Sequence, residues 1–442
     1  MRKSPLPFVI ASLVLTAGCF HDFQKADLSK LPTVPPAATA MPREVGKAPP
    51  AAAPARDVTV TTFSPRIQRL VPPALLPIDT GLVEGDAEAV DLRGKDLSRS
   101  DLSQRLDLLR KSMFDTNTLW PDILPEGFNP NAWLQNGINP GLGLDKLHEQ
   151  GLSGEGVNIA MVGEPILTSH AELKDALVHY EEFSTIHKEA DLHATAAASA
   201  MVGRTCGVAP GAKLYYFAAF AAQFQDELDK GYWDYGEYKK VFDRILEINT
   251  QMSAEDKIRL VVVDGALLDK NRDINNQVTH ENANYQDMWS SAVKLEVSGV
   301  YVMDYQDERN QVVHPFSISR NPMGDPNDLA MYMMSPLSTY FQTNFPAWHR
   351  TLASAYGDDT YTHYAAAPTL FVRNAAEKVD SFAQAFAAGL YALCLQQDKA
   401  VTPEQFWHAG RNHREFGVYL SLCGTRQREH RETGGRPRGS DD

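Results

Sequence analysis

From residue 142 onward, short apolar runs alternate with stretches in which apolar residues recur at helical spacing. The continuous runs predict strands that are buried on both faces of a sheet. The expected strands are 157–162, 214–218, 258–263 and 300–303. The expected helices are 192–202, 235–252, 381–395 and a stretch marked by Tyr285, Met288, Trp289, Ala292 and Val293. Because strands alternate with helices, the pattern predicts an α/β fold, a parallel sheet with helices on both faces.

Residues 1–18 have the pattern of an export signal, in which Arg2 and Lys3 precede an apolar run too short to span a membrane. The stretch Leu15-Thr16-Ala17-Gly18-Cys19 then resembles a bacterial lipobox. That resemblance implies that Cys19 is the lipidated first residue of the mature protein. Phe20 after it implies sorting to the outer membrane, facing the periplasm, with membrane contact through the lipid only. The alternative is an ordinary signal peptide with an incidental cysteine.

Three further segments surround the α/β pattern. Residues 19–56 are rich in Pro and Ala and predict an extended tether. Residues 57–150 form an accessory or pro-segment-like region, in which Leu92, Leu97 and Leu102 each follow an Asp at intervals of five residues. Three copies are too few for a repeat stack, so an irregular or helical stretch is favoured there. The α/β domain is expected at 151–424, followed by a polar, disordered tail at 425–442.

Charge and cysteine content restrict the partners. The chain has 42 Lys and Arg against 56 Asp and Glu, a formal net charge of −14, and no basic run, so no nucleic-acid partner is expected. Its histidines lack the close spacing of zinc ligands. Besides Cys19 there are three cysteines, Cys206, Cys394 and Cys423, so an exported chain has at least one unpaired thiol. Cys394 lies in an apolar helical pattern, which favours a core residue over a bridge to Cys423.

Three motifs carry candidate chemistry: Asp191-Leu192-His193-Ala194-Thr195, then Gly207-Val208-Ala209-Pro210, and finally Asp380-Ser381-Phe382-Ala383 followed by Ala388-Gly389. Together they resemble the catalytic domain of subtilisin-like serine peptidases over roughly 151–402. That resemblance implies a subtilisin-like sheet, His193 as the general base and Ser381 as the nucleophile. Many members of that family hold calcium on loop carboxylates, but nothing in this sequence locates a calcium site, and no cofactor is expected.

The sequence departs from the family pattern where a carboxylate should orient the base. The first strand ends in Gly163, which has no side chain, and Glu164 is the substitute that the sequence offers if the chain turns at Pro165. The run Val261-Val262-Val263-Asp264-Gly265 stands where the family has a strand that pairs with substrate. The stretch Ile78–Gly81 does match the family's Asp motif, but it follows several prolines that would break a strand, so it is not expected to be catalytic.

The donors for an oxyanion are also changed. After the strand at 300–303 the family has an Asn that donates to the oxyanion, but here Asp304 to Asp307 follow, with Gln306 as the one candidate donor. A carboxylate at that position would repel the developing charge. The expected result is weak or no labelling by a fluorophosphonate. Gly163→Asp is expected to raise that labelling only slightly, because the oxyanion donor would still be missing.

Two functions therefore compete. One is an exported serine peptidase homologue that is weakly active or inactive. The other is a pseudopeptidase that binds a peptide or a protein at the cell envelope. A purely structural envelope lipoprotein is a third alternative. The sequence names no substrate, partner or oligomeric state.

Overall fold

The computed structural model describes residues 90–110, 112–221, 234–264, 284–303, 316–320, 325–328, 332–336, 350–364 and 381–406. The export signal, Cys19, the tether, the motif at 78–81, Gln306, Cys423 and the tail at 425–442 lie outside these residues. Within the described part of the chain, no helix is long and apolar enough to cross a membrane.

The main sheet has five strands in the order β4-β5-β3-β6-β7, and every neighbouring pair is parallel. The four strands expected from the apolar runs are all present, and the predicted α/β fold class is confirmed. The edge strand β4 was not expected, because its polar residues interrupt the apolar pattern. The strands are β3 (Asn158–Gly163), β4 (Leu177–Glu182), β5 (Lys213–Ala218), β6 (Ile258–Val263) and β7 (Tyr301–Met303).

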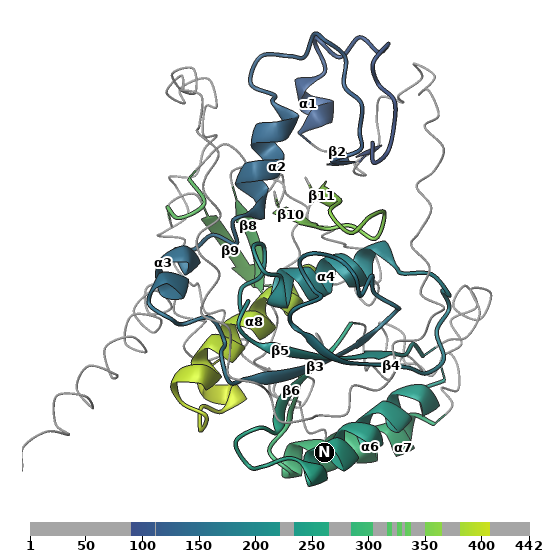
Figure 1. Cartoon of the computed structure of the whole chain (residues 1–442), viewed down its shortest axis with the longest axis vertical. Helices are drawn as coiled ribbons and strands as arrows, with labels where there is room; N and C mark the ends of the chain where they lie inside the picture. The colour runs from purple at the N-terminus through teal and green to yellow at the C-terminus, as the bar shows by residue number, and fades with distance from the viewer. Residues whose placement is uncertain are drawn as a thin grey trace, which may run out of the picture. The chain divides into compact units, whose positions relative to one another are not determined.

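Helices cover both faces of this sheet (Figure 1). Helices α4 (Leu192–Val202) and α8 (Ser381–Gln397) pack on one face, and α6 (Gly236–Gln251) and α7 (Tyr285–Val297) pack on the other. Strand residues alternate between the two cores: Ile159 and Met161 face α4 and α8, whereas Ala160 and Val162 face α6 and α7. This period of two is the strand geometry that the continuous apolar run requires for a sheet buried on both faces.

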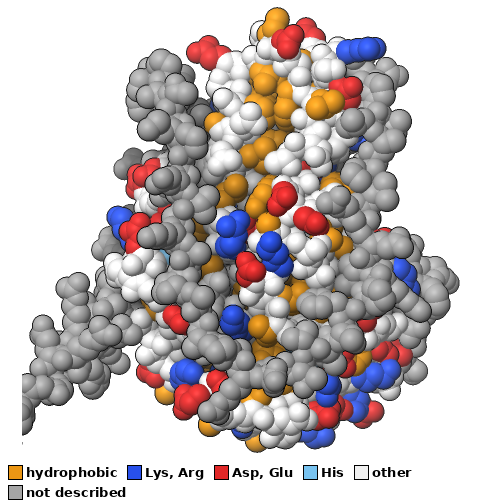
Figure 2. Space-filling model, in the orientation of Figure 1, with side chains coloured by type: hydrophobic (Ala, Val, Ile, Leu, Met, Phe, Trp, Pro, Cys, Tyr) orange, Lys and Arg blue, Asp and Glu red, His pale blue; other side chains and the backbone are white. Residues whose placement is uncertain are grey.

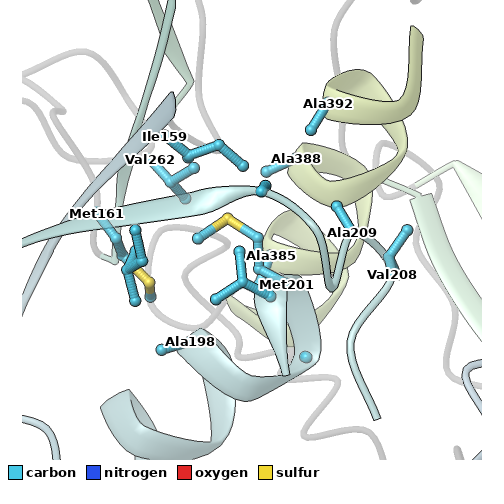
Figure 3. Packing of buried hydrophobic residues seen from close by; sticks show 14 of the residues in the cluster. Ile159, Met161, Ala198, Met201, Val208, Ala209, Val262, Ala385, Ala388 and Ala392 are labelled. Atoms are coloured by element: carbon cyan, nitrogen blue, oxygen red, sulfur yellow. The ribbon is translucent and has the colours of Figure 1, made fainter. Parts of the chain in front are cut away.

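Small residues bring α4 and α8 close to the sheet and to the turn that follows α4 (Figure 3). The turn Gly207–Pro210 lies against α8. A Cβ added at Gly389 would be 2.6 Å from Val208 Cβ and 3.3 Å from the backbone oxygen of Met201. Such distances are shorter than van der Waals contact, so glycine is required where α8 crosses this turn. The helix pair that carries the candidate residues is therefore held at a fixed separation.

Helix α7 exposes part of the stripe that was expected to be buried. Met288 and Ala292 are fully buried, but Val293 is 40% exposed and Val297 is 85% exposed. The predicted assignment of Val293 to the apolar face was thus wrong, because the buried face of α7 consists of Met288, Ser291, Ala292 and Leu295. On the face shown in Figure 2, acidic, basic and apolar side chains of the described residues are intermingled.

A second sheet, with the strand order β1-β2-β11-β10, joins distant parts of the chain. Strand β2 pairs antiparallel with β11, which places Phe114 opposite His363 across the predicted domain boundary at residue 150. Leu92, Leu97 and Leu102 each precede a turn and share one buried cluster with α2, so the five-residue repeat marks core positions of an irregular stretch. The elements are β1 (Val90–Asp91), α1 (Leu106–Leu109), β2 (Ser112–Asp115), α2 (Pro130–Ile138), β10 (Arg350–Ala353) and β11 (Tyr361–Tyr364).

The remaining described elements are α3 (Leu144–Glu149) and an antiparallel pair, β8 (Phe316–Arg320) and β9 (Tyr332–Pro336).

A buried carboxylate connects this second sheet to the end of α4. Glu172 accepts hydrogen bonds from Thr205 N at 2.7 Å, Thr205 Oγ1 at 2.6 Å, Cys206 N at 3.2 Å and Tyr361 Oη at 2.8 Å. Burial acts to raise the pKa of Glu172, but the hydrogen bonds from Thr205, Tyr361 and Cys206 together outweigh it and hold the pKa below its ordinary value. Glu172 is therefore an ionised structural residue.

Candidate active site

The candidate residues meet where β3 and β6 end and where α4 and α8 begin. In a parallel sheet the carboxyl ends of the strands lie at one edge, and functional sites of α/β folds commonly form there. Helix α4 begins at a defined position, because Asp191 accepts from Ala194 N at 2.7 Å as its N-cap. The Asp191 backbone N–H donates to Pro165 O at 2.7 Å, which ties this helix start to the chain after β3. His193 is thus held over the end of β3.

The imidazole of His193 faces a carboxylate from β6. Its Nε2 lies 3.4 Å from Asp264 Oδ1. The side chain of Asp264 is only 6% exposed, whereas that of His193 is 45% exposed, so one partner is fixed in the protein and the other reaches solvent. Asp264 directly follows β6, and its backbone N–H donates to Val162 O at 2.7 Å, which continues the ladder between β3 and β6.

The first turn of α8 lies against the face of the His193 ring. The ring of Phe382 stacks on the imidazole with a centroid distance of 4.7 Å and an interplanar angle of 25°. Tyr364 from β11 packs edge-on against Phe382 at 4.9 Å and holds that ring in place. Ser381 is the first residue of α8. The start of α8 and the start of α4, which carry the two candidate residues, are therefore adjacent, and a hydrogen bond between His193 and Ser381 stays a prediction.

Glu164, the carboxylate that the sequence offered as a substitute, is engaged elsewhere. Its two oxygens accept from Ile186 N and His187 N, each at 3.1 Å, and His187 Nδ1 is 3.4 Å away. Burial raises the pKa of Glu164 above its ordinary value. Glu164 thus holds the loop after β4, and the carboxylate in contact with His193 is Asp264 instead.

The space above Gly163 is already filled. A Cβ added there would be 3.0 Å from Asp264 Cβ, 3.0 Å from Tyr216 Oη and 3.4 Å from Asp264 Oδ2. A side chain at residue 163 would require Asp264 or Tyr216 to shift by a few tenths of an ångström, and the slight rise in labelling expected for Gly163→Asp stays a prediction. Sequence reasoning noted Asp264 as part of a changed strand but gave it no role. One signal for Asp264 was available in the sequence: it is the first polar residue after the apolar run of β6, and β6 pairs with β3.

The part of the chain described here contains no group of three or more His, Cys, Asp or Glu that could hold a metal ion. Asp304, Gln306 and Asp307, on which the oxyanion prediction depends, lie outside that part. Cys206 and Cys394 are both buried. Burial raises the pKa of the Cys206 thiol well above its ordinary value, so this cysteine is not a nucleophile candidate.

No family model matches the chain, and no curated protein matches it. Solved structures similar to it include the prenylagaramide maturation protease PagA, with 13% identity and a TM-score of 0.35, covering 60% of this chain and 84% of that one. A cold-adapted subtilisin-like serine proteinase has 15% identity and a TM-score of 0.35, covering 58% of this chain and 81% of that one. The PatG macrocyclase domain has 14% identity and a TM-score of 0.34, covering 60% and 87%. Likenesses this low say nothing about the activity of this chain.

Proposed function

We propose that this chain is a slow serine-type peptidase, with Ser381 as the nucleophile and His193 as the base. The observation that supports this most directly is the stacking of Phe382 on His193 at 4.7 Å. Ser381 precedes Phe382, and successive Cα atoms are about 3.8 Å apart, so the backbone of Ser381 lies close to the imidazole. The sequence motifs around both residues resemble those of subtilisin-like peptidases, and the two motifs come from distant parts of the chain.

The proposed chemistry is acyl transfer. The Ser381 hydroxyl attacks the carbonyl carbon of a peptide bond while its proton passes to His193, and a tetrahedral oxyanion forms. The proton then passes from His193 to the departing amine, leaving an acyl-enzyme. Water, deprotonated by His193, hydrolyses that ester and regenerates the hydroxyl.

The start of α8 supplies part of the electrostatic support for this reaction. The first backbone N–H groups of a helix lack partners within the helix, and the helix dipole makes this end positive. Helix α8 spans Ser381–Gln397, so an oxyanion formed at Ser381 would lie at the positive end of a long helix. The side-chain donor that the family places after the strand matching 300–303 is replaced here by the stretch around Gln306, which is why the proposed rate is low.

A second candidate function is a pseudopeptidase that binds a peptide or protein without cleaving it. The separation between His193 Nε2 and Asp264 Oδ1, at 3.4 Å, favours this alternative, since a charge-assisted hydrogen bond is about 2.7–2.9 Å long. Catalytic hydrogen bonds often tighten only when substrate binds, which makes the peptidase the first candidate.

Fluorophosphonate labelling of the full chain separates the two candidates. We expect slow labelling of the wild type that Ser381→Ala abolishes and that His193→Ala lowers by at least about 100-fold. Ser290→Ala, an exposed serine on α7, is the matched control and should label like the wild type. Absence of labelling in a folded wild type would leave the binding module ahead. Binding to an immobilised peptide library would then identify its ligand.

The sequence of the amino terminus supports a proposal for the location. We propose that Cys19 carries lipid and that the chain is held at the outer membrane, facing the periplasm, with a peptide or protein as its partner. Mass spectrometry of the mature protein should find Cys19 acylated and first in the chain. Cys19→Ala should release the protein into the soluble fraction, and cleavage at another residue would contradict this proposal.

A further inference from the structure

The end of β3 and the end of β6 share one volume. In the ladder between these parallel strands, Val162 is opposite Val263, so the next residues, Gly163 and Asp264, are also neighbours. Ile159 and Met161 on β3 face the core under α4 and α8, as does Val262 on β6. By the period of two, Gly163 and Asp264 point to that same face, toward α4. A carboxylate at either position would therefore be directed toward His193.

Neighbouring strands are about 4.8 Å apart, so a carboxylate can move from one strand to the next and still reach the same imidazole. The contact distances agree with such an exchange. The Asp264 side chain occupies the space that a side chain on residue 163 would need, with 3.0 Å between its Cβ and the position of an added Cβ. The hydroxyl of Tyr216, buried on β5, closes the third side of this space at 3.0 Å.

We infer that Asp264 is the residue that orients His193, supplied by β6 in place of β3, and that Gly163 is required to make room for it. This inference rests on the proposed function, because orientation matters only if His193 acts as a base. Two other nearby carboxylates are already engaged by backbone donors: Glu164 binds the N–H groups of residues 186 and 187, and Asp191 caps α4. Asp264 is a positioning residue, since it acts through the imidazole.

The relocation also changes which nitrogen of His193 does the chemistry. Because Nε2 is the nitrogen that lies 3.4 Å from Asp264 Oδ1, the inferred neutral tautomer carries its proton on Nε2, directed toward the carboxylate. The lone pair is then on Nδ1, and Nδ1 takes the proton from the Ser381 hydroxyl. The resulting imidazolium has both nitrogens protonated and is stabilised by the ionised Asp264, which itself gains no proton. In the usual serine peptidase triad the two nitrogens have the opposite roles.

The test combines a tautomer measurement with labelling. In the Ser381→Ala protein, the ¹⁵N spectrum of His193 should show the proton on Nε2, and Asp264→Asn should redistribute it between the two nitrogens. In the Ser381-containing protein, Asp264→Asn should slow fluorophosphonate labelling by about 100-fold or more, since losing the orienting carboxylate costs serine peptidases about 10⁴-fold. Asp256→Asn, an exposed carboxylate just before the same strand, is the control and should change neither result.

A double-mutant cycle tests the shared volume. Gly163→Ala should lower the midpoint of thermal unfolding in the wild type but less in Asp264→Gly, because the second change removes one of the two side chains that crowd this space. Additive effects would overturn the role given to Gly163.

Different results would overturn the inference about Asp264 and the proposed peptidase function. A proton on Nδ1 of His193, or an Asp264→Asn protein that labels at the wild-type rate, would overturn the inference and leave a Ser381-dependent hydrolase intact. No labelling of the wild type would overturn the proposed function. The ¹⁵N measurement needs no activity, and its comparison with the Asp264→Asn variant would still show whether Asp264 orients His193.

Discussion

Removing the Glu172 carboxylate should destabilise the protein strongly. Four hydrogen bonds between 2.6 and 3.2 Å end on this side chain, from Thr205, Cys206 and Tyr361. Hydrogen bonds to a charged group contribute about 1.5–3 kcal/mol each, but such contributions are not additive, and the ion regains hydration when the protein unfolds. A buried donor that loses its acceptor costs about 1–3 kcal/mol, and Glu172→Ala removes the acceptor of Thr205, Cys206 and Tyr361 together. Because these costs are not additive, we expect Glu172→Ala to lower the free energy of unfolding by about 3–5 kcal/mol.

Glu172→Gln should cost about 2–3 kcal/mol, because the side chain keeps its volume but turns an N–H toward buried donors. Urea denaturation followed by circular dichroism measures both losses, with an unchanged dependence on urea if the transition stays two-state. Glu255→Ala is the control: its carboxylate is 79% exposed and 3.6 Å from Lys399, so the change should stay within about 0.5 kcal/mol. A loss below about 1 kcal/mol for Glu172→Ala would refute the structural role of this carboxylate.

Three further predictions concern packing, pH and a thiol. Gly389→Ala should destabilise the protein by about 1–3 kcal/mol although alanine favours helices, because the new Cβ would be 2.6 Å from Val208 Cβ. Urea denaturation measures this loss, and a gain in stability would contradict the prediction. Burial lowers the pKa of His148 and of His170 below the ordinary value of 6.5. At acid pH the unfolded chain therefore binds more protons than the folded protein, and the free energy of unfolding should fall as the pH drops below about 6.5. Equal stability at pH 7.5 and 5.5 would contradict this. The Cys206 thiol, fully buried and with a raised pKa, should resist iodoacetamide in the native protein and react after denaturation, as peptide mass spectrometry would show.

The main sheet and its helices could be predicted from the sequence, because a strand buried on both faces consists of a continuous run of apolar residues. Residues 258–263 and 192–202 were both predicted with the bounds that the structure has. The second sheet was not, since its strands have only two to four residues and pair with partners far away in the chain. Pairings of that kind leave no local pattern.

The candidate site was predicted in part for a related reason. Motifs around His193 and Ser381 are local and can be read from consecutive residues. The pairing of His193 with Asp264 depends on which strand lies beside β3, and on the register of that pair, which no local pattern contains. A sequence that lacks a carboxylate at Gly163 therefore looks defective, while the same sequence folded brings one in from the neighbouring strand.

Strand β2 is synthesised long before β11, the strand with which it pairs. Thr116, just after β2, and Tyr361, at the start of β11, are separated by 245 residues. The Thr116 N–H donates to Tyr361 O at 3.0 Å, and the Tyr361 N–H donates to Thr116 Oγ1 at 3.3 Å. A ribosome adds about 5–20 residues per second, so one edge of β2 waits about 10–50 s for its partner. Closing so long a loop costs about 3 kcal/mol more than closing one of about ten residues, which makes this sheet a late step in folding. A chain that stops before residue 361 would leave that edge open to a strand from another molecule.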